Sequence, residues 1–192
     1  MTRNRFHSLT LSAMLFGGLF SATAHAYLLP CQLVTQMAGS HIYQAKLDRV
    51  GSMLAPDELP AQWNLSLLER HGGWFIYQTP QVWFERQTCG PLTKRLENGA
   101  GYGFMPVLLN QKTGHNAVLT GTFVLKTYRP EHLSGVIERY GFKLLTMLPK
   151  QDSAIVDVKP LASYDDMIEV LDKDRDVDLI APLLSEPMYR LR

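Results

Sequence analysis

The sequence predicts an α+β protein, with a strand-rich N-terminal region followed by a smaller mixed module and an extended C-terminal tail. Two observations lead to this class. Short aromatic and β-branched runs, separated by glycine and proline turns, fill the chain up to residue 119. From residue 117 onward, strand-like alternation and helix-like spacing follow each other in turn.

Residues 1–26 carry the pattern of a cleavable export signal. A basic start is followed by an apolar run at residues 9–20 and by the small-x-small motif Ala24-His25-Ala26. The apolar run is shorter than the ~20 residues of a membrane-spanning helix. We therefore expect a periplasmic or secreted protein that begins at residue 27 and has no membrane partner after cleavage.

The charge of the chain is close to neutral. Removal of Arg3 and Arg5 with the signal changes the net charge from +1 to −1. A neutral chain does not attract nucleic acid or an anionic membrane, so neither is expected as a partner.

Cys31 and Cys89 are the two cysteines of the chain. In the oxidising compartment that the signal predicts, we expect them to form a disulfide. Free or metal-binding thiols are the alternative, although no CxxC pair or histidine-rich neighbour completes a metal site.

Residues 27–119 are predicted to be a strand-rich extension without a long helix. The aromatic and β-branched runs predict strands at Ile42–Leu47, Trp63–Leu68, Trp74–Gln78, Val82–Arg86 and Tyr102–Leu109. The order in which these strands pair is not predicted.

Residues 120–185 are predicted to form a second module with six elements. Alternation predicts strands at 117–128, 142–148, 154–158 and 177–181, the last ended by Pro182. Helices are predicted from Pro130 to Gly141 and from Ser163 onward, where Asp166 completes a capping box. The resulting β-α-β-β-α-β order is typical of the split-βαβ, ferredoxin-like arrangement.

Each helix of this module has one apolar stripe, so both are expected to cover one sheet face and to leave the other open. We predict that Leu145, Met147, Ile155 and Ile180 lie on this open face as a docking surface. The alternative is that some of them face the helices as core residues, because a shift of one residue in register exchanges the two faces.

No catalytic residue, metal ligand or cofactor site is predicted. Asp172, Asp174, Asp176 and Asp178 alternate like the start of a calcium loop, but Val177 and Leu183 stand where the loop needs Gly and Glu. A solvated turn is the preferred interpretation. His41, His71, His115 and His132 have no metal-binding spacing, and no nucleophile–base–acid set can be proposed.

Three segments of the second module resemble a known family. Phe123-Val124-Leu125-Lys126, Arg139-Tyr140-Gly141-Phe142 and the stretch Asp176 to Pro182 are similar to the inhibitory prodomains of subtilisin-family serine proteases. A separate exported protein of this kind resembles the Aeromonas-type external chaperones of secreted kexin-like proteases. The likeness covers residues 120–192.

The resemblance implies an intermolecular chaperone and inhibitor without catalytic activity. Its open sheet face would contact the protease, and an inhibitory tail, residues 186–192, would enter the substrate cleft as a product-like strand. Arg192 would occupy the primary specificity pocket, Leu191 the next and Tyr189 the fourth, with Met188 and Arg190 in the same strand. Leu191 departs from the kexin-like preference for a second basic residue.

Two alternatives stay open. One is a free-standing secreted inhibitor without a role in folding. The other is a periplasmic binding or assembly module that shares only the fold with prodomains.

Overall fold

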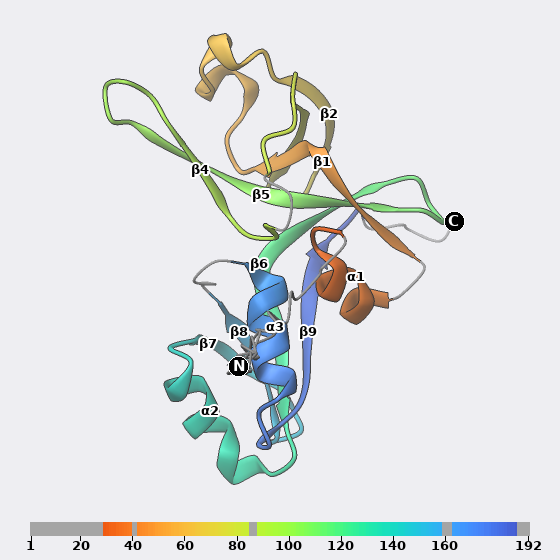
Figure 1. Cartoon of the computed structure of the whole chain (residues 1–192), viewed down its shortest axis with the longest axis vertical. Helices are drawn as coiled ribbons and strands as arrows, with labels where there is room; N and C mark the ends of the chain where they lie inside the picture. Colours follow the sequence, from red (N-terminus) through yellow and green to blue (C-terminus); the bar gives the residue numbers. More distant parts are fainter. Residues whose placement is uncertain (1–28, 40–41, 85–87, 159–162, 188–192) are drawn as a thin grey trace, which may run out of the picture.

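The computed structural model describes residues 29–39, 42–84, 88–158 and 163–187, and within these ranges the protein is an α+β structure built on an antiparallel sheet (Figure 1). The predicted export signal lies outside the described residues. Among the described residues, no helix is long and apolar enough to cross a membrane.

The elements of the N-terminal half are α1 (Gln32–Gly39), β1 (Tyr43–Ser52), β2 (Ser66–His71), β3 (Trp74–Gln78), β4 (Leu92–Arg95) and β5 (Gly101–Asn110). Short 3-10 turns lie at Pro56–Glu58 and Ala61–Trp63. The C-terminal half consists of β6 (Asn116–Thr127), a 3-10 turn at Pro130–His132, α2 (Leu133–Arg139), β7 (Lys143–Met147), β8 (Ser153–Asp157), α3 (Tyr164–Asp172) and β9 (Val177–Ser185).

The long strand β6 belongs to both halves. The strand order is β2-β3-β1-β5-β6-β8-β7, with β4 on β5 and β9 on β6. The first residues of β6 pair with β5, and residues 123–126 lie between β8 and β9. The two halves therefore share one continuous sheet, as Figure 1 shows.

One apolar core fills the C-terminal half. Four apolar residues of the sheet are buried against the helices: Phe123, Leu125, Val156 and Ile180. The helices contribute Val136 of α2 and Ile168 and Leu171 of α3 to the same cluster. We call this side of the sheet the helix face. Ser163 is the N-cap of α3, as predicted, because its hydroxyl accepts a hydrogen bond from the Asp166 N–H at 3.1 Å.

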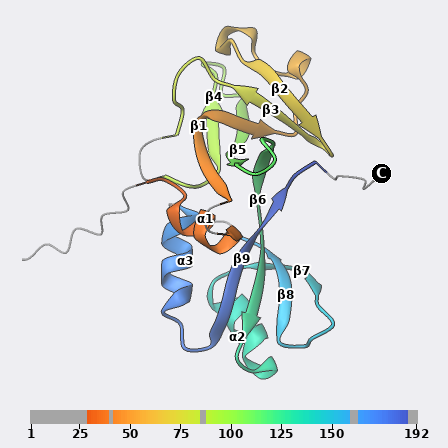
Figure 2. The same cartoon turned by 90° about the vertical axis from the view of Figure 1, so that its right-hand side faces the viewer.

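Helix α1 of the N-terminal half completes this core. Val34 is fully buried in the same cluster as α3 and β9, and Figure 2 shows α1 and α3 together on one side of β9. The Cys31–Cys89 disulfide joins the start of α1 to the loop before β4, as predicted. The carbonyl of Cys89 also accepts a hydrogen bond from the Tyr164 N–H, which anchors the disulfide to α3.

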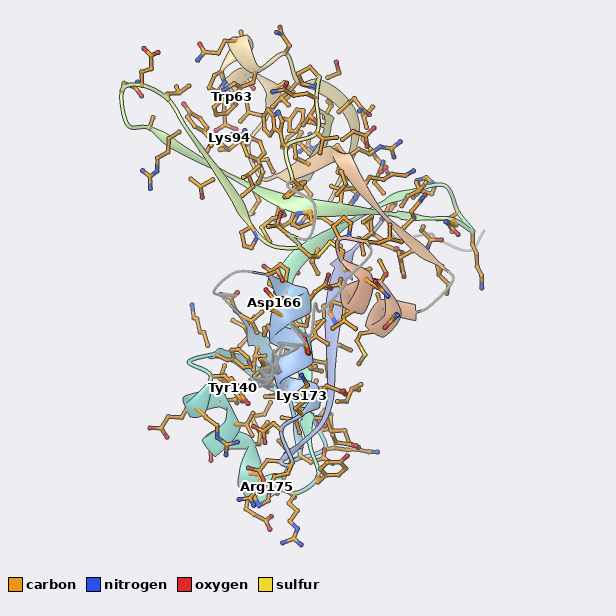
Figure 3. The ribbon with its side chains drawn as sticks, viewed as in Figure 1. Trp63, Lys94, Tyr140, Asp166, Lys173 and Arg175 are labelled. Carbon is orange, nitrogen blue, oxygen red and sulfur yellow. A yellow bond between two sulfur atoms is a disulfide. The ribbon has the colours of Figure 1, made fainter. Side chains whose placement is uncertain are left out.

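The N-terminal half has its own aromatic core. Trp63 contacts Trp83, Tyr102 and Phe104 edge-to-face, with ring centroids 5.0–5.8 Å apart. Lys94 covers the Trp83 ring at 4.9 Å, and Figure 3 shows Trp63 and Lys94 in this part of the molecule.

Several predicted elements differ from the structure. Trp63 lies in a 3-10 turn because it fills the aromatic core, and residues 82–84 are not a strand because Trp83 and Phe84 turn into that core. Helix α1 and strand β4 were not predicted. Strand β9 continues through Pro182, because it pairs with β6 on one side and an edge strand tolerates a missing N–H.

Candidate docking surface and tail root

The side of the C-terminal sheet opposite the helix face carries a row of partly exposed apolar residues. Val124 at the centre pairs with Ile155 of β8 on one side and with Ala181 of β9 on the other. Leu179, in the neighbouring row, is 39% exposed. We call Val124, Ile155, Leu179 and Ala181 the open face.

A lysine closes one end of the open face. Lys126 pairs with Leu179 across β6 and β9 and forms an ion pair with Asp178. The hydrogen bond from Lys126 to Asp178, followed by the negative charge of Asp178, raises the pKa of Lys126. The open face is thus apolar at its centre with a cation at its border.

Ile155 lies on the open face, whereas Met147 does not. A β-bulge between Leu144 and Thr146 makes Leu145 an extra residue in β7. Thr146 therefore pairs with Ile155, while Met147 pairs with Ala154 on the helix face. Without the bulge, strict alternation would have put Leu145 and Met147 on the side of Ile155.

Ile180 also does not lie on the open face. It pairs with Leu125 and is 3% exposed within the helix-side core. The register of β9 turns Leu179 and Ala181 outward instead, so these two replace Ile180 on the open face.

Strand β7 is a short, exposed edge of the sheet. All five of its residues are exposed, including Leu144, Leu145 and Met147. Leu145 thus remains accessible, as the extra residue of a bulge at the border of the sheet.

The aspartate-rich turn before β9 is an ion-pair network. Arg139 of α2 binds Asp174 at 2.5 Å and Asp176 at 2.9 Å, and the Tyr140 hydroxyl donates to Asp174 at 2.9 Å. Burial alone would raise the pKa of Asp174, but the Asp176 N–H, Tyr140 and Arg139 together lower it. Figure 3 shows Tyr140, Lys173 and Arg175 at this end of the molecule.

This network corrects the expected solvated turn. The Asp174 side chain is 6% exposed, so the carboxylate holds α2 to the turn. Among the described residues, no group of three or more His, Cys, Asp and Glu side chains is arranged to hold a metal ion.

The histidines of the described part lie in separate places. His71 Nδ1 is 3.5 Å from Ser185 Oγ, His115 binds Glu69 at 3.1 Å, and His132 lies 3.1 Å from Asp176. The distance between Ser185 and His71 is at the outer limit of a hydrogen bond. Glu69, which lies on the same strand as His71, forms its hydrogen bond with His115. His41 lies outside the described residues.

The predicted cleft-binding residues Met188, Tyr189, Arg190, Leu191 and Arg192 lie outside the described residues. The segment that leads to them is described as far as Pro187. This segment follows β9 and lies beside α1 and β1. A surface pocket of about 320 Å³ at this place is lined by Ala38, Tyr43, Pro182, Leu184, Glu186 and Pro187. We call Glu186 and Pro187 the tail root.

The sequence analysis did not predict two parts of this surface, the residues Leu179 and Ala181 on the open face and the contacts of Glu186. The alternation of Thr122, Val124 and Lys126 placed Val124 on one face of its strand, but the β9 residues beside it follow from the register between β6 and β9. The contacts of Glu186 with β1 and β5 have no local signal, because the partners are more than 70 residues away. Comparison of the chain with protein-family models, with curated proteins and with solved structures found no significant match.

Proposed function

We propose that this protein is an exported intermolecular chaperone and inhibitor of a subtilisin-family, kexin-like serine protease, without catalytic activity of its own. The open face would contact the protease, and residues 188–192 would enter its substrate cleft as a product-like strand. The observation that carries the proposal is the apolar row Ile155–Val124–Ala181, which crosses the sheet opposite the helices and adjoins the strand that leads to the tail.

The topology of the C-terminal half supports the resemblance to prodomains. Strand β8 lies between β6 and β7, and β6 lies between β8 and β9. Each strand–helix–strand unit is therefore split by one inserted strand, a strand order that is typical of ferredoxin-like modules. We propose on this basis that residues 120–185 form a ferredoxin-like module.

The electrostatics suit the proposed partner. Arg190 and Arg192 give the tail two positive charges, and a guanidinium pairs bidentately with the carboxylate of an acidic specificity pocket. A folded chain that binds only the native protease also stabilises that native state by mass action, which would assist folding.

Export to the periplasm or the medium fits this role. The Cys31–Cys89 disulfide belongs to an oxidising compartment, and the sequence of residues 1–26 has the order of a signal peptide.

Inhibition assays test the tail. Residues 27–192 are expected to inhibit one or more proteases in a panel of kexin-like and subtilisin-like enzymes, and a chain that lacks residues 188–192 is expected to inhibit weakly or transiently. If neither chain inhibits any member of the panel, the proposal is wrong and a binding or assembly module becomes the better interpretation.

A matched pair of variants tests the open face. Leu179→Glu introduces a charge into the open face, whereas Val170→Glu introduces one on the outer side of α3, where Val170 is 53% exposed. We expect Leu179→Glu alone to weaken protease binding. Equal binding by both variants would exclude the open face as the contact.

Refolding separates a chaperone from an inhibitor. Denatured protease is diluted with or without residues 27–192, and the complex is then dissociated to measure recovered activity. A chaperone increases the recovered activity, whereas a free-standing inhibitor leaves it unchanged.

A further inference from the structure

The end of β9 is held by the N-terminal half of the protein. Beyond the irregularity in β6, Leu184 pairs with Leu119 and Ser185 pairs with Val118, on the part of β6 that also pairs with β5. The Thr120 hydroxyl donates to the Leu183 carbonyl at 3.0 Å. The chain thus reaches the tail root after it has left the open face.

Asn110, the last residue of β5, contacts the tail root. Its Nδ2 group donates to Glu186 Oε1 at 3.4 Å. Its Oδ1 atom accepts hydrogen bonds from the Lys112 and Thr113 N–H groups at 3.0 and 3.2 Å. Because the turn holds the oxygen, the amide nitrogen is directed toward Glu186, and Asn110 is 7% exposed.

Tyr43 of β1 lines the same pocket as Glu186 and approaches it from a second strand. Burial, a hydrogen bond to Glu186 and the charge of that carboxylate together raise the pKa of Tyr43 to about 12, and a hydrogen bond with Asn110 offsets part of the rise. Tyr43 and Glu186 line the same pocket as Pro187. Two strands of the N-terminal half therefore converge on one carboxylate at the start of the tail.

We propose that Tyr43 and Asn110 are positioning residues that hold Glu186, so that residues 27–119 orient the tail toward the protease cleft. This inference rests on the proposed inhibitory function and assigns a role to the N-terminal half. A held root fixes the position of Glu186 and Pro187, from which the tail continues, and preorganisation of this kind lowers the entropic cost of binding.

An isosteric substitution tests the contact. Asn110→Asp keeps an oxygen for the Lys112 and Thr113 N–H groups but turns a carboxylate oxygen toward Glu186. We expect about tenfold weaker inhibition of the protease, the effect of losing one hydrogen bond to a charged group. Tyr43→Phe is expected to weaken inhibition in the same direction, whereas Glu97→Gln, at an exposed turn of the N-terminal half, is the control without effect.

A second substitution tests rescue. Combined with Asn110→Asp, Glu186→Gln supplies an amide donor opposite the new carboxylate and restores the bond with its direction reversed. We expect the double variant to recover most of the inhibition. All these variants should bind equally well to a protease whose cleft is blocked by a covalent peptidyl inhibitor. In that complex the tail cannot enter the cleft, and binding depends on the open face, which the substitutions do not change.

The outcomes distinguish this inference from the proposed function. If Asn110→Asp inhibits like the unmodified chain while removal of residues 188–192 abolishes inhibition, the positioning role is wrong and the function stands. If neither the unmodified chain nor any variant inhibits a protease, the proposed inhibitory function is wrong. The contact of Asn110 with Glu186 can then be tested independently with a spin label. A nitroxide on Met188→Cys should become more mobile with Asn110→Asp, and unchanged mobility would overturn the inference.

Discussion

Gly121 lies in the middle of β6, where the strand passes from β5 to β8 and β9. Its φ angle is +83°, and a Cβ atom at this position would lie 2.8 Å from the Tyr164 hydroxyl. Both the backbone conformation and the close approach of a buried ring therefore require glycine here.

We predict that Gly121→Ala lowers the free energy of unfolding by about 2 kcal/mol, because alanine is strained at positive φ and also contacts Tyr164. Urea unfolding measures the effect. Gly103→Ala is the matched control, since a Cβ atom at Gly103 would have no neighbour within 4 Å and its φ is not positive. Equal unfolding midpoints for the two variants would contradict the prediction.

Asp165 is a buried carboxylate that caps a distant helix. It is 2% exposed and accepts hydrogen bonds at 3.0 Å from the Gln32 and Val34 N–H groups at the start of α1. Burial raises the pKa of Asp165, and these N–H groups offset only part of the rise. The folded protein therefore holds this proton more tightly than the unfolded chain.

Because the folded-state pKa is raised, Asp165 favours folding at low pH and costs stability as the pH rises through that pKa. We predict that the stability of the unmodified protein, relative to Asp165→Asn, decreases as the pH rises from about 4 through the raised pKa of Asp165. Urea unfolding of both proteins at each pH measures this difference. Carboxylates with the opposite shift, Glu69 and Asp174, occur in both proteins and cancel. A constant difference would exclude the linkage.

The contacts of a single residue can be predicted from the sequence where the partner residue is near in the chain. The cap of α3 by Ser163 was predicted because the bond to Asp166 spans three residues. The cap of α1 by Asp165 was not, because its partners lie 131 and 133 residues away.

At the scale of elements, strand β7 shows the limit of alternation. Periodicity predicted the strand within one residue at each end, but one extra residue reversed the faces of everything after Leu145. A bulge of this kind is decided by pairing with β8, so Met147 could not be assigned from β7 alone.

The Cys31–Cys89 disulfide lies directly before the first residue of helix α1. We predict that the double variant Cys31→Ser/Cys89→Ser lowers the free energy of unfolding by about 3 kcal/mol, because the bond closes a loop between residues separated by 58 positions. Thermal or urea unfolding measures the loss. The same loss should follow reduction of the unmodified protein, and an unchanged midpoint after reduction would show that the disulfide does not support α1.

At the scale of the whole molecule, the two halves share a sheet and a core. Val34 and Cys31 of the N-terminal half are buried with Ile168, Leu171 and Ile180 of the C-terminal half. The division at residue 119 falls inside β6, which pairs with strands of both halves.

We predict that residues 120–192 alone do not form a stable native fold. Without α1, apolar surface of α3 and β9 becomes exposed, and Asp165 loses its N–H partners. Dispersion of amide signals in an NMR spectrum measures this, with residues 27–192 as the control. A dispersed spectrum for the fragment would mean that the C-terminal half folds independently.

Local sequence patterns were sufficient to predict the α+β class, the six elements after residue 117, the Cys31–Cys89 pair and the cap of α3. These follow from local periodicity, turn residues and the chemistry of the compartment. Three-dimensional packing was needed to establish the bulge in β7, the burial of Ile180, the course of β9 through Pro182 and the contacts of Glu186. Each of these depends on register or on a partner far away in the chain, and neither is encoded in a short window of residues.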